Sequence, residues 1–150
     1  MLDEAGRHAM IPLLHHHADL LQPPPPAAHR LERELAAVVR RTLTLTDALV
    51  DALGALRAIG IGATPFKGPA LAVAAYGSLV MRQFDGVDVL IHRADLMAAE
   101  RVLVQRGYRE ARAGQVRAWV RGDIVLVLHC GLAPRWVGTA GMAGLWVRRR

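Results

Sequence analysis

Phe66-Lys67-Gly68-Pro69-Ala70-Leu71 and Asp85-Gly86-Val87-Asp88-Val89-Leu90-Ile91 carry the clearest structural signals in the chain. Pro69 suits the first position of a helix, because its missing N–H would be unpaired there anyway. That helix presents free backbone N–H groups and a positive dipole end beside Gly68, where a phosphate could sit. The second segment is a β-branched apolar strand with acids at its start. Together they predict an α/β domain with an anion site close to an acidic strand.

The first part of the chain has a helical rhythm of apolar residues three or four apart. This spacing predicts a helix over 5–21 and, over 28–59, one long amphipathic helix or two abutting ones. Pro23 to Pro26 favour a short, stiff polyproline connector between them. We therefore expect an N-terminal helical segment over 1–60.

The remainder, 61–150, is expected to form the α/β core, in one compact unit with the helical segment. Gly107 is typical of the end of a helix, and Arg121-Gly122-Asp123 is typical of a hairpin turn. The order is strand, helix, strand, helix, strand, strand, over 61–66, 69–76, 87–91, 94–106, 115–120 and 124–129.

Composition limits the class of protein. A chain of 150 residues with 53% hydrophobic content can bury one core but hardly two. The single cysteine, Cys130, excludes an internal disulfide framework and indicates a reducing, cytoplasmic setting. Asp3 and Glu4 stand where a signal peptide needs positive charge, and no apolar run reaches the roughly 18 residues of a membrane span. We expect no membrane segment.

The net charge of +6 comes from arginine, because Lys67 is the only lysine among 19 basic residues. One interpretation is an anionic partner, a nucleotide or a nucleic acid, and the other is a solvated basic surface. Nucleic acid is the less favoured partner, because exposed aromatics do not alternate with the basic residues. As the sole ammonium and next to a glycine, Lys67 is the strongest ligand candidate.

Several short motifs in a fixed order carry a family resemblance over about Ala5 to Leu132. They are Lys67-Gly68, Ala70-Leu71, Tyr76-Gly77, Arg82, Asp88-Val89-Leu90-Ile91, Asp95-Leu96, Gly107-Tyr108 and Leu128-His129. This set resembles the uncharacterised nucleotidyltransferase family of the polymerase-beta-like superfamily. The resemblance implies a minimal nucleotidyltransferase fold, a small mixed sheet packed by helices, with an NTP as donor and magnesium as metal. Members of the family are usually longer, so we expect this chain to hold the catalytic half.

The metal ligands implied by the resemblance are incomplete. Two carboxylates at i and i+2 on a strand face the same way, and a third on a neighbouring strand completes a cage for two ions. The family pattern places these acids on Gly86, Asp88 and Val127, so two of the three are missing. Asp85 faces away on a regular strand, although a bulge at Gly86 could swing it inward.

Two hypotheses follow. In the first, the protein transfers an NMP from an NTP to a hydroxyl acceptor, with Asp88 and Asp85 holding Mg²⁺. Lys67 and Gly68 then contact phosphates, and Arg82 and His129 contact the substrate. In the second, the domain is catalytically inactive and serves as a nucleotide-binding or interaction module.

Each of these residues also has a purely structural interpretation. Asp88 could be a strand-end acceptor, Arg82 a loop residue in a salt bridge, and His129 a satisfied strand-end histidine. The acceptor, the preferred base and the oligomeric state are left open. An apolar tail, Trp136, Met142, Leu145 and Trp146, is expected to complete the core or to dock on another chain.

Overall fold

The computed structural model describes residues 2–113 and 116–131. The apolar tail expected at Trp136 to Trp146 lies outside the described residues. Within the described residues, no helix is long and apolar enough to cross a membrane.

Three short helices precede the long one: α1 (Leu2–Arg7), α2 (Ile11–His16) and α3 (Ala18–Leu21). The prediction of one helix over 5–21 is therefore wrong. The chain leaves helical geometry at Ala9, whose φ of 56° is left-handed, and Pro12 then lies in the first turn of α2. Ala5 and Ile11 pack against Leu31 of the long helix in a small apolar cluster.

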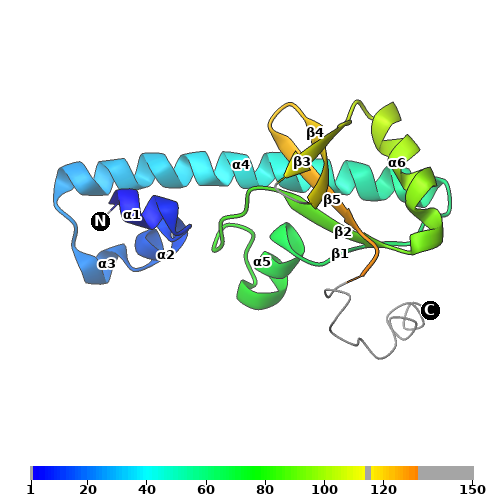
Figure 1. The fold of residues 1–150 in the computed structure, drawn as a ribbon. Coiled ribbons are helices and arrows are strands. Elements are labelled where there is room, and N and C mark those ends of the chain that lie inside the picture. The colour runs from blue at the N-terminus through cyan, green and yellow to red at the C-terminus, as the bar shows by residue number, and fades with distance from the viewer. Residues whose placement is uncertain (1, 114–115, 132–150) are drawn as a thin grey trace.

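The long helix, α4 (Pro25–Ala58), is continuous over 34 residues, a length of about 50 Å. Pro25 and Pro26 occupy its first turn, where a missing N–H costs no hydrogen bond, so the polyproline interpretation is wrong for these two residues. The N-terminal helices flank the first half of α4 and the sheet lies along its second half (Figure 1). Its buried residues lie on one face of the helix and are concentrated in its second half: Leu31, Thr42, Leu45, Ala48, Leu49, Ala52, Ala55 and Leu56.

Five strands form one mixed sheet in the order β1-β2-β5-β4-β3. β2 and β5 pair in parallel, whereas the other neighbours are antiparallel, which confirms the expected small mixed sheet. The strands are β1 (Ala63–Pro65), β2 (Val87–Ile91), β3 (Arg109–Ala113), β4 (Val116–Arg121) and β5 (Ile124–His129). β1 is shorter than the strand expected over 61–66, and β3 was not predicted.

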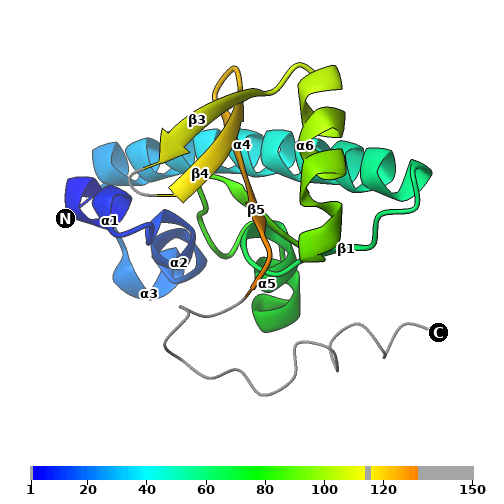
Figure 2. The same ribbon diagram turned by 45° about the vertical axis from the view of Figure 1, so that its right-hand side comes forward.

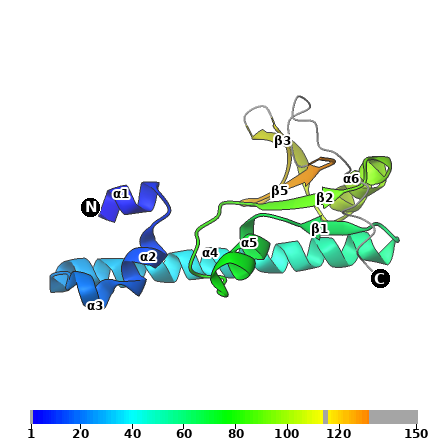
Figure 3. The same cartoon turned by 90° about the horizontal axis from the view of Figure 1, so that it is seen from below.

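Two helices complete the core: α5 (Gly68–Tyr76) and α6 (Leu96–Gln105), the latter preceded by a 3-10 turn over Arg93–Asp95. Both were predicted. α5 contacts β1 and β2 near one edge of the sheet, away from β3 and β4 (Figure 2). α4 runs along the sheet when the molecule is seen from below (Figure 3).

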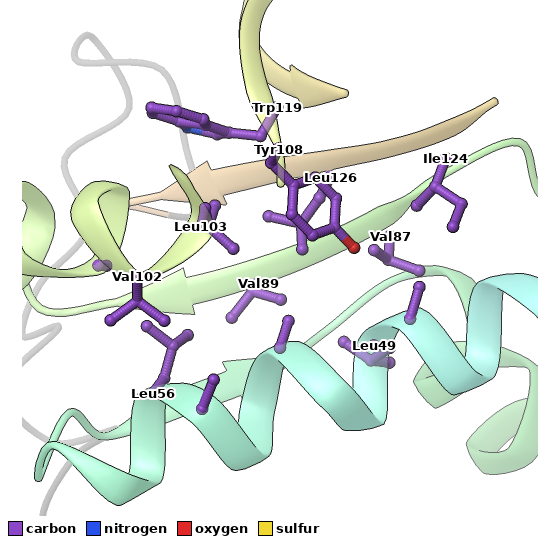
Figure 4. Close-up of a cluster of buried hydrophobic side chains, with 14 of the residues drawn as sticks. Leu49, Leu56, Val87, Val89, Val102, Leu103, Tyr108, Trp119, Ile124 and Leu126 are labelled. Carbon is purple, nitrogen blue, oxygen red and sulfur yellow. The ribbon is translucent and has the colours of Figure 1, made fainter. Parts of the chain in front are cut away.

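The main core lies between α4, α6 and one face of the sheet (Figure 4). Alternate residues of the two central strands, Val87, Val89 and Leu126, pack there against Leu56 of α4 and Leu103 of α6. Because side chains alternate along a strand, the residues between them face the other side of the sheet. This opposite face carries Asp88 of β2 together with Val127 and His129 of β5.

Candidate functional site

Three side chains from three parts of the chain meet at Asp88. The Asp88 Oδ1 atom lies 2.7 Å from His129 Nε2 and 3.4 Å from Lys67 Nζ. The Asp88 and His129 side chains are 20% and 23% exposed, whereas that of Lys67 is 53% exposed. We call these residues the Asp88 cluster. The structure thus brings together three of the residues predicted for the site.

The sheet holds these side chains in place. Asp88 and Leu90 of β2 stand opposite Val127 and His129 of β5 in the parallel register, so Asp88 and His129 lie one diagonal step apart. Lys67 is the second residue after β1, which pairs with β2 on its other side. The cluster therefore lies where the loop after β1 meets the two central strands.

Phe66 forms a wall beside the cluster, and it was not among the predicted site residues. Its ring meets the His129 ring edge to face, with centroids 4.9 Å apart, and Lys67 Nζ lies 5.3 Å from its centroid. The Phe66 N–H also donates to the Asp88 carbonyl at 3.4 Å, which continues the pairing of β1 and β2. Phe66 therefore lies against both partners of Asp88, Lys67 and His129. In the sequence, only its position next to Lys67 indicated that Phe66 could belong to the site.

Gly68 begins α5 directly beside Lys67. It has a φ of 52°, and a Cβ there would lie 3.1 Å from the Gly86 carbonyl oxygen. Glycine is thus required both by the left-handed conformation and by the close approach of the backbone. Lys67 is the N-cap residue of α5, and its side chain does not cap the helix. The N–H groups in the first turn of α5, to which Pro69 contributes none, are therefore not capped by this side chain.

Position 86, where the family pattern would place an acid, has no room for a side chain. A Cβ on Gly86 would lie 2.8 Å from the Val125 carbonyl oxygen, closer than carbon and oxygen can approach. The third position of the pattern, Val127, is the direct partner of Asp88 on β5. It lies where the family pattern requires an acid, but it supplies no oxygen ligand.

Asp85 lies apart from the Asp88 cluster. Its side chain is exposed, and its carbonyl accepts a hydrogen bond of 3.0 Å from Arg41 Nη2 on α4. Asp85, Gln83 and Arg41 line a hollow of about 220 Å³ between α4 and the segment that leads into β2. Within the described part of the chain, no hydrogen bond or ion pair joins Asp85 to the cluster.

Arg82 is half-buried in the same segment, and its Nη1 atom is fully buried. Among the described residues this atom has no hydrogen-bond partner. A buried guanidinium nitrogen normally has an acceptor, so its environment suits an anion or a further polar group.

The described residues do not fit a site for two magnesium ions. Magnesium requires several oxygen ligands in nearly octahedral geometry. Residues 2–113 and 116–131 contain no group of three His, Cys, Asp or Glu side chains that could hold a metal. Of the three expected acids only Asp88 is present, and one of its oxygens is already engaged by Lys67 and His129.

Comparison with known proteins identifies the family. A family model described as "Uncharacterised nucleotidyltransferase" matches residues 1–148. No curated protein matches. Among solved structures, that of the antibiotic-resistance factor ANT(2'')-Ia matches with a TM-score of 0.49 and 19% identity. The match covers 59% of this chain and 46% of that chain, so this chain spans less than half the length of that protein. Because the family model extends over nearly its whole length, the chain belongs to the uncharacterised nucleotidyltransferase family.

Proposed function

We propose that this domain binds a nucleoside triphosphate at Lys67 and the N-terminus of α5, and that it does so without catalysing two-metal nucleotidyl transfer. The observation that carries the proposal is the position of Lys67. Its ammonium is held by Asp88 but is half exposed, directly before the uncapped start of α5. A half-exposed ammonium group beside the first turn of a helix is a favourable combination for phosphate oxygens.

Arg82 and His129 extend this site in the proposal. Arg82 is a candidate for a further anion contact, because its Nη1 has no acceptor among the described residues. His129 donates to Asp88 through Nε2, since an ionised carboxylate can only accept. Membership of the family supports a nucleotide as the anion.

The proposal is tested by thermal unfolding of the purified chain with each of ATP, GTP, CTP and UTP. Ligand that binds the native state raises the melting temperature by mass action. We expect a rise with at least one nucleotide, and a loss of that rise in Lys67→Met. Arg33→Met removes one charge from the exposed surface of α4 and should behave as wild type. Equal shifts in both variants, or none in wild type, would refute the proposal.

Transfer of an NMP from an NTP to a hydroxyl is the second candidate, favoured by family membership and by the presence of Asp88. It would need Asp85 to approach Asp88, so that both could serve as magnesium ligands. The test is transfer of label from an α-labelled NTP to a panel of hydroxyl acceptors. Transfer that is lost in Asp88→Ala would establish this candidate, and transfer that survives would remove Asp88 from the mechanism.

A further inference from the structure

We infer that this site takes its nucleotide free of divalent metal, with the Lys67 ammonium acting as a built-in cation where relatives of this superfamily would use a metal ion. The inference rests on the proposed function, and it specifies the ionic form of the ligand. Three observations support it: the contacts of Asp88 with Lys67 and His129, the lack of space for a side chain at position 86, and the net charge of the Asp88 cluster.

The single remaining acid is already partnered. Two donors, Lys67 Nζ and His129 Nε2, converge on the same oxygen, Asp88 Oδ1, at 3.4 and 2.7 Å. Phe66 lies against both donors and limits where they can go. A metal ion at Oδ1 would have to displace the ammonium group, and at either oxygen of Asp88 it would find only one carboxylate among the described residues.

Neither of the two strand positions that would carry a further acid supplies one. The Val125 carbonyl fills the space that a side chain at position 86 would need, at 2.8 Å from the Cβ position. Val127 presents an apolar surface next to Asp88 in the register. Position 86 could therefore carry a carboxylate only if the backbone of β5 moved away, and Val127 offers no oxygen ligand.

The charge of the cluster favours a bare polyphosphate. Three carboxylates carry a net charge of −3 and repel a triphosphate unless metal ions intervene. In the Asp88 cluster the charges of Asp88 and Lys67 cancel. A free triphosphate therefore meets no electrostatic barrier here, whereas magnesium would compete with Lys67 for the same phosphate oxygens.

Isothermal titration calorimetry of the full chain with ATP, once in excess EDTA and once in excess Mg²⁺, tests the inference. If another nucleotide gives a larger rise in melting temperature than ATP, the same two titrations are made with that nucleotide. We expect binding in EDTA that is as tight as in Mg²⁺ or tighter. Binding that appears only with Mg²⁺ would overturn the inference and leave the proposed function standing. Absence of binding in both conditions would refute the two together.

Variants identify the cation. In EDTA, Lys67→Met should weaken binding by about tenfold or more, the usual value of a charge-assisted contact, whereas Lys67→Arg should retain most of it. Arg33→Met is the matched control and should leave the affinity unchanged. Far-ultraviolet circular dichroism of each variant checks that the fold is intact.

The variant Asp88→Asn distinguishes two roles of Asp88: positioning of Lys67 and His129, or ligation of a metal ion. If Asp88 only positions Lys67 and His129, loss of its negative charge leaves binding in EDTA within about threefold of wild type or tighter, since long-range repulsion falls. If Asp88 is a metal ligand, Mg²⁺-dependent binding is lost in this variant. The second result would overturn the inference.

Discussion

At Gly86 the chain passes so close to β5 that no side chain fits between them. The contact is with a backbone atom, the Val125 carbonyl oxygen, 2.8 Å from the Cβ position. Backbone atoms cannot rotate away as the end of a flexible side chain can. The residue that lacks the expected carboxylate is therefore also a packing requirement of this sheet, and restoring the acid would strain it.

Gly86→Ala should lower the free energy of unfolding by about 1–3 kcal/mol, the range for overpacking. Gly54→Ala is the matched control, because Gly54 is exposed in α4 with no atom within 4 Å of its Cβ position. This control should raise stability by about 0.5–1 kcal/mol, since alanine is the better helix former. Chemical denaturation measures both, and equal effects would contradict the close approach at Gly86.

Tyr108 is buried in the core with its hydroxyl unpaired among the described residues (Figure 4). Burial raises its pKa above the usual value, although the Arg121 guanidinium over its ring acts in the opposite direction. The pKa of Tyr108 is thus higher in the folded than in the unfolded protein. The neutral phenol therefore contributes its full stability below about pH 10, and this stability is lost as the pH rises through the folded-state pKa.

Tyr108→Phe should be neutral at pH 7 or stabilising by up to about 1 kcal/mol, because an unpaired hydroxyl is removed. The variant should also lose less stability than wild type between about pH 9 and 11. Tyr76 is exposed, so Tyr76→Phe provides the control. A clear loss of stability at pH 7 in Tyr108→Phe would show that the hydroxyl has a partner.

At the scale of elements, α4 connects the parts of the molecule. Arg41 on α4 donates to Asp123 in the hairpin turn, to its Oδ2 at 2.6 Å and its carbonyl at 2.8 Å. The same side chain donates to the Asp85 carbonyl at 3.0 Å, directly before Gly86. One guanidinium thus ties the β4–β5 turn and the start of β2 to the long helix. This contact fixes the segment that carries Asp88.

Arg41→Met should lower the free energy of unfolding by about 1 kcal/mol, because two backbone carbonyls lose a hydrogen-bond donor. The ion pair itself adds little to this loss, since the Asp123 side chain is largely exposed. The neighbouring Arg40 is exposed, and Arg40→Met should change stability by less than about 0.5 kcal/mol. Hydrogen exchange provides a second readout. Faster exchange of amides in residues 122–125 is expected in Arg41→Met alone, and unchanged exchange would contradict a tie through Arg41.

At the scale of the whole molecule, the sequence predicts best those elements whose signals are local. β2 follows from its β-branched alternation, α5 from Gly68 and Pro69, and the β4–β5 hairpin from Gly122. β3 was missed because its sequence, Arg109 to Ala113, is charged and lies at the edge of the sheet. The break after α1 depends on Ala9 in a conformation that alanine rarely adopts.

The candidate site was only partly predictable, because its residues come from parts of the chain that are far apart in the sequence. The family resemblance gave Lys67, Asp88 and His129 separately, and the parallel pairing of β2 with β5 brings them together. The steric role of Gly86 depends on how closely β5 approaches, which no local pattern reports. Arg41 and Asp123 are 82 residues apart in the chain, so their contact has no signal in the sequence.

The most direct test of a nucleotide site at Lys67 is affinity labelling with periodate-oxidised ATP in EDTA, followed by reduction and peptide mass spectrometry. The ribose dialdehyde forms an imine with a nearby amine, and Lys67 is the only lysine in the chain. A nucleotide site at Lys67 should give one adduct, on Lys67, that excess ATP suppresses. Labelling of Lys67 that ATP does not suppress, or labelling confined to the terminal amine, would contradict it.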